Sequence, residues 1–356
     1  MRRTPLHDEH VALGGKVVDF HGWALPVQFA GIIEEHNHTR TKAALFDCSH
    51  MGEFTVRGEP AARAFGKLVC LDPLKIPVGR GKYGAMLNDD GGIIDDVIAF
   101  RLAEFDFYVV TNAGPLEAVS RRILGLSESS EMSDVSDATA KIDIQGPKSR
   151  DILAQEIPEC TALKYYQARR ATWNGMDIVL ARTGYTGELG YELFVPNRIA
   201  VDLWRTLLSY PDVKPAGLGA RDTLRTEMCY GLSGQDFDES RTPLEAGMAG
   251  FIAWDKEFVG RDALIAKRVA GGYPLLTPIK TSDRRAPRHG FEVRHNGDVV
   301  GVVTSGTFGP SVGHGVGFAY VPQALSKPGT KLTAGPRDLE IETMTIPIYT
   351  KGTCRV

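Results

Sequence analysis

The chain has 356 residues, of which 43% are hydrophobic and 24% are charged, and its formal net charge is −3. These values are typical of a soluble globular protein with two or three domains, and they give no reason to expect nucleic acid or an acidic membrane as a partner. The five cysteines are scattered without a CxxC pair, which argues against a disulfide framework or a zinc site and fits a reducing cytoplasm. No apolar run reaches the ~18 residues of a membrane span.

Helix and strand patterns alternate irregularly over the first two thirds of the chain. The first half of this region predicts helices over 31–46, 59–71 and 115–126 and strands in 51–58, near 82–87 and 93–101, and in 105–114. A Ser-rich surface connection is expected over 127–137. The second half predicts strands over 140–146 and 190–196, a hairpin that turns at Asn174-Gly175, and helices over 147–155, 197–209 and 217–231. Because the order lacks a strict βαβ rhythm, it favours an α+β fold over a doubly wound sheet.

Beyond residue 272 the pattern becomes all-β. Residues 291–306 predict a hairpin around Asn296-Gly297, and further strand patterns follow at 315–322 and 339–349. We therefore expect two regions, one over residues 1–272 and an all-β, barrel-like C-terminal domain over residues 273–356.

Two adjacent carboxylates stand inside the apolar strand of NDDGGIIDDVIAF, residues 88–100. Side chains alternate along a strand, so Asp96 is expected on one face with Ile94 and Ile98, and Asp95 on the other. Burying an unpaired charge is costly, so such a carboxylate is usually paired, ligated or held ready for a substrate. The pattern makes this hairpin a candidate functional site.

Three other stretches carry candidate chemistry, each with a structural alternative. RTGYTGELGYE, residues 182–192, joins glycines that let backbone approach a ligand to tyrosines that can stack on a flat ring, although a tight turn explains it equally well. Arg221, in the helix that begins GLGARD, either forms salt bridges or binds a carboxylate-bearing ligand. His36 and His38 do not share a helix face, so we expect solvent-exposed side chains rather than a metal site.

Together these stretches resemble the folate-dependent aminomethyltransferase family, the T-protein of the glycine cleavage system. The resemblance covers nearly the whole chain and runs, in order, through LFDCSHMGEFTVRG, NDDGGIIDDVIAF, IDIQGPKSRDIL, RTGYTGELGYELFVP, GLGARDTLR, SGQDFDESRTPLEAG and TSGTFGPSVGHGVGFAYVP. It implies a three-domain cloverleaf around a central folate channel, with two intertwined α+β subdomains within residues 1–272.

The resemblance also implies which residues form the site. Asp96, the second aspartate of GGIIDD, is implied to be the acidic catalytic residue that contacts the folate ring nitrogens. As a carboxylate it can stabilise positive charge that develops at nitrogen. The side chains implied to line the folate are Met51, Tyr83, Asn112, Tyr185, Glu192 and Arg221. No metal is implied.

The implied reaction transfers a one-carbon unit from the aminomethyl-lipoyl arm of H-protein to tetrahydrofolate and releases ammonia and methylenetetrahydrofolate. The sequence departs from the family pattern at some positions, for example at Ser233, where a tyrosine often precedes Gly-Gln. Two alternatives therefore stay open. One is a tetrahydrofolate-dependent demethylase of a small methylated donor, and the other is a non-enzymatic folate-binding accessory protein. The expected partner is lipoylated H-protein, and the expected location is the cytoplasm.

Overall fold

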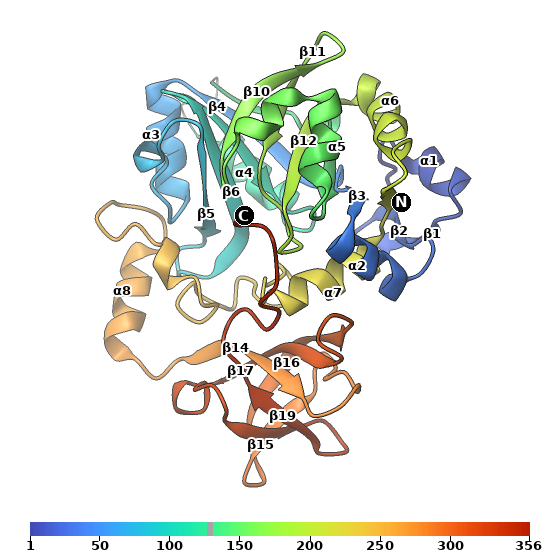
Figure 1. The fold of residues 1–356 in the computed structure, drawn as a ribbon. Coiled ribbons are helices and arrows are strands. Elements are labelled where there is room, and N and C mark those ends of the chain that lie inside the picture. Colours follow the sequence, from blue (N-terminus) through green and yellow to red (C-terminus); the bar gives the residue numbers. More distant parts are fainter. Residues whose placement is uncertain (127–130) are drawn as a thin grey trace.

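The computed structural model describes residues 1–126 and 131–356, which form two stacked β-sheets with helices outside them, and a separate barrel (Figure 1). The chain opens with a short helix and a two-stranded hairpin against the body of the protein. These elements are α1 (His7–Ala12), β1 (Lys16–Phe20) and β2 (Trp23–Gln28).

The first large sheet has five strands in the order β5-β6-β7-β4-β8. Its members are β4 (Gly52–Arg57), β5 (Arg80–Leu87), β6 (Ile93–Ala103), β7 (Asp106–Thr111) and β8 (Met132–Asp134). Its outer face is covered by α3 (Glu59–Leu68) and α4 (Leu116–Leu124), whose apolar side chains form one core with Phe54 and Val97 of the sheet.

The second large sheet has six strands in the order β10-β11-β12-β9-β3-β13. Its members are β3 (Ala43–Asp47), β9 (Thr139–Gln145), β10 (Ala168–Trp173), β11 (Met176–Ala181), β12 (Gly190–Pro196) and β13 (Val213–Pro215). Its outer face is covered by α5 (Ser149–Glu156) and α6 (Asn197–Leu208), whose Trp204 is fully buried in that core. The inner faces of the two sheets meet in a smaller core that joins Phe100 and Tyr108 to Phe194.

Two further helices lie between this body and the barrel, α2 (Ile32–Thr41) and α7 (Leu218–Glu227), and α8 (Arg261–Ala270) leads into the barrel. The barrel closes in the order β14-β17-β16-β15-β18-β19. Its strands are β14 (Pro274–Thr281), β15 (Glu292–His295), β16 (Asp298–Gly309), β17 (His314–Pro322), β18 (Lys331–Ala334) and β19 (Leu339–Thr343). After β19 the C-terminal tail leaves the barrel and returns to the two-sheet body (Figure 1).

Three local predictions are wrong. The helix expected over 31–46 ends at Thr41, and the following Ala43–Asp47 is the fully buried strand β3. The surface connection expected over 127–137 contains β8, which pairs with β4, while residues 127–130 lie outside the described part of the chain. His36 is fully buried rather than exposed, because that face of α2 lies against α7 and a barrel turn.

Candidate active site

The two adjacent aspartates of β6 differ sharply in exposure. Asp95 is fully buried, whereas Asp96 is half-buried. Ile94 does not share the face of Asp96 as the simple alternation predicted, because β6 bulges at Ile94 and sends this side chain into the outer core with Val97. Ile98 and Phe100 pack in the inner core between the sheets. The predicted alternation is therefore correct from Asp96 onward, and Asp96 shares the inner face with these two residues.

The register of the five-stranded sheet shows which side chains accompany Asp96. Tyr83 pairs with Ile98, Ile98 with Val110, and Val110 with Glu53. Directly paired residues of antiparallel strands project from the same face. These four paired residues therefore lie on the inner face, where Ile98 is the next inward-facing residue of β6 after Asp96. Tyr83 of β5 accordingly lies beside the acidic pair.

Asn112, the residue after β7, bridges the two aspartates. Its side-chain Nδ2 donates to Asp95 Oδ1 at 2.8 Å and to Asp96 Oδ1 at 2.7 Å. Its backbone N–H donates to Asp95 Oδ2 at 2.8 Å. One asparagine thus holds both carboxylates in a fixed arrangement.

The environment makes both carboxyl groups hold their protons more tightly than an isolated aspartic acid does. Burial and the neighbouring charge of Asp96 raise the pKa of Asp95. Burial also raises the pKa of Asp96, although hydrogen bonds from Tyr83 and Asn112 oppose the rise. A charge on one member of the pair therefore disfavours a charge on the other.

The six-stranded sheet presents a buried ion cluster on its inner face. Glu192 pairs in register with Asp143, and Lys141 Nζ lies 2.6 Å from Asp143 Oδ1 and 2.9 Å from Glu192 Oε1. Thr183 Oγ1 donates to the other oxygen of Glu192 at 2.6 Å. Burial alone would lower the pKa of Lys141, but the two carboxylates outweigh it and raise the pKa. The lysine is therefore a fixed cation that orients the carboxylate of Glu192.

Arg221 of α7 extends this cluster towards the tyrosines of the 182–192 loop. Its Nη1 lies 3.3 Å from Asp143 Oδ2, and its guanidinium lies 4.9 Å from the ring centre of Tyr185. Tyr185 in turn stacks on Tyr230, with ring centres 5.7 Å apart, and its hydroxyl donates to the carbonyl of Gly231. Arg221 and Tyr185 thus present a cation beside an aromatic face.

The structure brings six of the seven predicted site residues into two groups. Asp96, Asn112 and Tyr83 form the first group, and Glu192, Arg221 and Tyr185 form the second. Met51, just before β4, is half-buried, and its side chain packs against two apolar clusters of the described residues. Tyr166 lies between the two sheets, since its carbonyl accepts from the N–H of Gly81 at 2.8 Å and its N–H donates to the carbonyl of Arg182 at 2.9 Å.

Lys141, Asp143 and Tyr166 were not among the site residues predicted from the sequence. The strand AKIDIQG does contain a signal, because Lys141 and Asp143 are charged residues at alternate positions of an apolar strand. Ionisable side chains on an apolar strand are expected to be paired or functional in this strand as in β6. Tyr166 carries no comparable signal, because it lies in a loop, whose conformation is not indicated by an alternating pattern.

Two family models and several relatives match the chain over most of its length. The GCVT N-terminal domain matches residues 6–256, and the glycine cleavage T-protein C-terminal barrel domain matches residues 276–348. The aminomethyltransferase of Halothermothrix orenii is 40% identical over 347 residues, covering 96% of this chain and 97% of that protein. The aminomethyltransferase of Saccharopolyspora erythraea is 39% identical over 364 residues, covering 99% of each chain. The crystal structure of glycine cleavage system aminomethyltransferase T from Bartonella henselae aligns with a TM-score of 0.91 at 31% identity, covering 99% of both chains.

A two-sheet α+β body with a closed C-terminal barrel, and with acidic and basic side chains between the sheets, defines a transferase of the T-protein type. The chain belongs to the glycine cleavage T-protein family and is an aminomethyltransferase. The resemblance and the fold class drawn from the sequence are thereby confirmed. The relatives named here favour aminomethyl transfer over the demethylase and accessory alternatives.

The described part of the chain lacks a metal-binding cluster and a membrane-spanning helix. No group of three or more His, Cys, Asp or Glu side chains in the described ranges is placed to hold a metal ion. Among the helices of residues 1–126 and 131–356, none is long and apolar enough to cross a membrane.

Proposed function

We propose that this aminomethyltransferase uses tetrahydrofolate as its one-carbon acceptor and the aminomethyl-lipoyl arm of H-protein as its donor. The observation that carries the proposal is the half-buried Asp96, oriented by Asn112 and placed on the inner face of a sheet whose opposing sheet presents Glu192. The glycine cleavage T-protein family to which the chain belongs supplies the reaction class.

The side chains fit the chemistry of a reduced folate. Its aminopyrimidine ring offers N–H donors, which a fixed carboxylate such as Glu192 accepts well. Tyr83 and Tyr185 provide aromatic surface for a flat ring. Arg221 has a single side-chain hydrogen bond within the described residues, so guanidinium N–H groups remain for an anionic part of the ligand. These four residues therefore serve binding rather than proton transfer.

Asp96 is the residue that acts on the reacting centre. As the donor thiolate leaves, the aminomethyl carbon becomes an iminium, and a folate nitrogen attacks it and becomes positively charged. The ionised Asp96 stabilises that charge in a site of low dielectric. The proton on that nitrogen moves to the amine, which leaves as ammonia. The second folate nitrogen then closes onto the carbon and releases its proton to give methylenetetrahydrofolate, and the thiolate freed in the first step takes up a proton to give the dihydrolipoyl arm.

The test supplies aminomethyl-loaded H-protein and tetrahydrofolate and measures ammonia release. We expect turnover that requires both substrates. Folate binding without turnover, or formation of methyltetrahydrofolate from a small methylated compound in place of ammonia release, would overturn the donor assignment.

A further inference from the structure

We infer that Asp95 is a positioning residue that orients Asp96 through the side-chain amide of Asn112. The inference rests on the proposed function, because it assigns a role around the same reacting carboxylate. It goes beyond that function by making the first aspartate of the pair part of the catalytic arrangement rather than of the core.

Geometry excludes a direct role for Asp95 in ligand binding. Its side chain is fully buried, and it projects from β6 on the side opposite to Asp96. Both of its oxygens are occupied by Asn112, Oδ2 by the backbone N–H and Oδ1 by the side-chain nitrogen. Asp95 therefore acts on the site only through Asn112 or through its charge.

The hydrogen bonds of Asn112 show what Asp95 fixes. An amide nitrogen has two hydrogens, and here one points to each carboxylate. An amide oxygen in the same place would face two carboxylate oxygens, so the pair determines which way the amide is turned. Asn112 Oδ1 then points away from the carboxylates and accepts no hydrogen bond from the described residues. This leaves Oδ1 available to a ligand N–H.

The acidic pair has no compensating cation among the described residues, so its two carboxyl groups do not ionise together easily. No lysine or arginine in the described ranges forms an ion pair with either carboxylate. The titratable groups that face Asp96 are the phenols of Tyr83, Tyr166 and Tyr185, and the hydroxyl of Ser233 faces Asp95. Phenols are neutral at ordinary pH. The environment raises the pKa of Asp95 to about 8 and that of Asp96 to about 6, so Asp96 is the member of the pair that ionises first and Asp95 keeps its proton at that step.

Asp95→Asn keeps the size of the side chain and replaces the carboxyl group by an amide. Asp95 keeps its proton while Asp96 ionises, so the substitution removes no charge at that step and the acid limb of the kcat–pH profile should stay near its wild-type position. The new amide cannot accept an N–H at both ends, so Asn112 loses one anchor. We expect kcat to fall by ~10-fold or more as the geometry loosens. Asp89→Asn, at an exposed position of the same hairpin, is the matched control and should leave both quantities unchanged.

Asn112→Ser and the double variant test whether the effect passes through the amide. Asn112→Ser removes a donor to Asp96 and so raises its pKa, and the acid limb of this variant should move to higher pH. If Asp95 acts through Asn112, adding Asp95→Asn to Asn112→Ser should cost little further kcat. Fully multiplicative losses, or a wild-type kcat in Asp95→Asn, would overturn the inference.

Carbon-13 NMR titration of the aspartate carboxyl groups in the wild-type protein needs no substitution, and it applies even if Asp95→Asn fails to fold. Two coupled, elevated titrations are expected for the pair, and two independent titrations at ordinary pH would overturn the coupling. This measurement also separates the two proposals. Absence of ammonia release would refute the proposed function, whereas the titration tests the Asp95–Asp96 pair by itself.

Discussion

At the scale of single residues, the inner faces of the sheets hold carboxyl groups in three different states. Asp96 is half-buried beside a second acid, Glu192 is paired with a buried lysine, and Glu53 is fully buried without any hydrogen-bond partner among the described residues. Each state gives a different response to losing the charge. The three positions can therefore be distinguished by conservative substitution.

Asp96→Asn preserves the size of the side chain and removes its charge. If the carboxylate stabilises positive charge at the folate nitrogen, kcat should fall by ~10²-fold or more, while the melting temperature and tetrahydrofolate affinity stay close to wild type. Steady-state ammonia release and equilibrium folate binding measure the two sides of this prediction. A variant with near-normal kcat would contradict the assignment of Asp96.

Glu53 should lower the stability of the protein at neutral pH. Burial raises the pKa of its carboxyl well above the ordinary value. An acid whose pKa is higher in the folded than in the unfolded state lowers the free energy of unfolding as pH rises above the unfolded value of about 4.3. Glu53→Met should therefore raise the free energy of unfolding at pH 8 by about 1–3 kcal/mol, and by less near pH 4.

Urea unfolding at the two pH values measures the effect of Glu53→Met, with the exposed Glu104→Met as the matched control. A loss of stability at pH 8 would show that the native carboxyl has a partner, such as bound water, and would contradict the prediction.

The residues of the site could be predicted to the extent that their signal is local. A carboxylate inside an apolar strand can be recognised from the sequence pattern alone, and Asp96 was predicted in this way. Ile94 was assigned to the wrong face because a bulge depends on pairing with β5, which the strand itself does not encode. His36 was misplaced for a similar reason, since its burial depends on α7 and Ser311, which are remote in sequence.

At the scale of elements, long and strongly patterned segments were predicted well, whereas short buried ones were not. The helix over 31–46 was extended too far because the alanines and leucine of β3 suit either state, and only pairing with β9 and β13 makes them a strand. β8 has three residues, too few for an alternating pattern to emerge.

The attachment of α1 to β3 gives a prediction at this scale. Thr4 Oγ1 and His10 Nε2 lie 2.6 and 2.7 Å from Asp47 Oδ2, and Ser49 N–H donates to Oδ1 at 2.9 Å. Burial alone would raise the pKa of Asp47, but the hydrogen bond and charge of His10, with the other donors, lower it to about 2. A depressed pKa contributes stability above the unfolded value of about 3.9, and that stability is lost as pH falls towards 2.

Asp47→Asn should therefore lower the free energy of unfolding at pH 7 by about 2–3 kcal/mol, and the difference from wild type should shrink below pH 4. Chemical denaturation between pH 2.5 and pH 7 measures it, and Asp8→Asn on the exposed side of α1 is the control. A difference that stays constant over this pH range would mean that packing, not charge, holds α1 in place.

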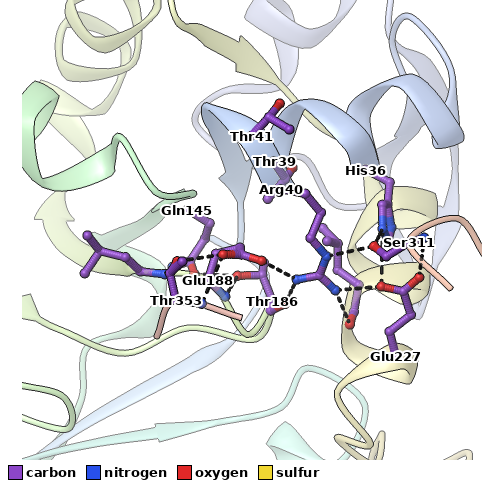
Figure 2. A network of polar contacts seen from close by, with 12 residues as sticks. His36, Thr39, Arg40, Thr41, Gln145, Thr186, Glu188, Glu227, Ser311 and Thr353 are labelled. Atoms are coloured by element: carbon purple, nitrogen blue, oxygen red, sulfur yellow. Dashed lines mark hydrogen bonds and ion pairs between the residues drawn. The ribbon is translucent and has the colours of Figure 1, made fainter. Parts of the chain in front are cut away.

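At the scale of the whole molecule, one arginine joins four parts that are far apart in sequence. Figure 2 shows Arg40 of α2 reaching the 182–192 loop, α7 and the barrel turn. Its guanidinium lies 2.8 Å from both Glu188 Oε1 and Glu227 Oε2, and its Nε donates to Ser311 Oγ at 3.1 Å. The tail joins the network because Thr353 Oγ1 donates to Glu188 Oε2 at 2.6 Å.

The aromatic ring of the tail completes this junction. Tyr349 lies with its ring centre 4.1 Å from the guanidinium of Arg40, and its backbone N–H donates to the carbonyl of Glu227 at 2.9 Å. Residues 346–356 therefore return from the barrel to the two-sheet body through contacts that share one buried cation. The 182–192 loop, which carries Tyr185 and Glu192, is held from the same point.

Arg40→Met should consequently loosen the barrel and the tail as well as destabilise the protein. Removing the cation leaves two buried carboxylates without their partner, a change that typically costs about 3–5 kcal/mol. We expect faster amide hydrogen exchange across residues 346–356 and the 310–313 turn, with the α5–α6 side of the six-stranded sheet little changed. Arg169→Met, at an exposed position of β10, is the matched control and should leave exchange at wild-type rates. If the tail of Arg40→Met exchanged no faster than in the control, the network would not be what holds it, and the tail would have to be held by its contacts with Gly187 and Arg182 instead.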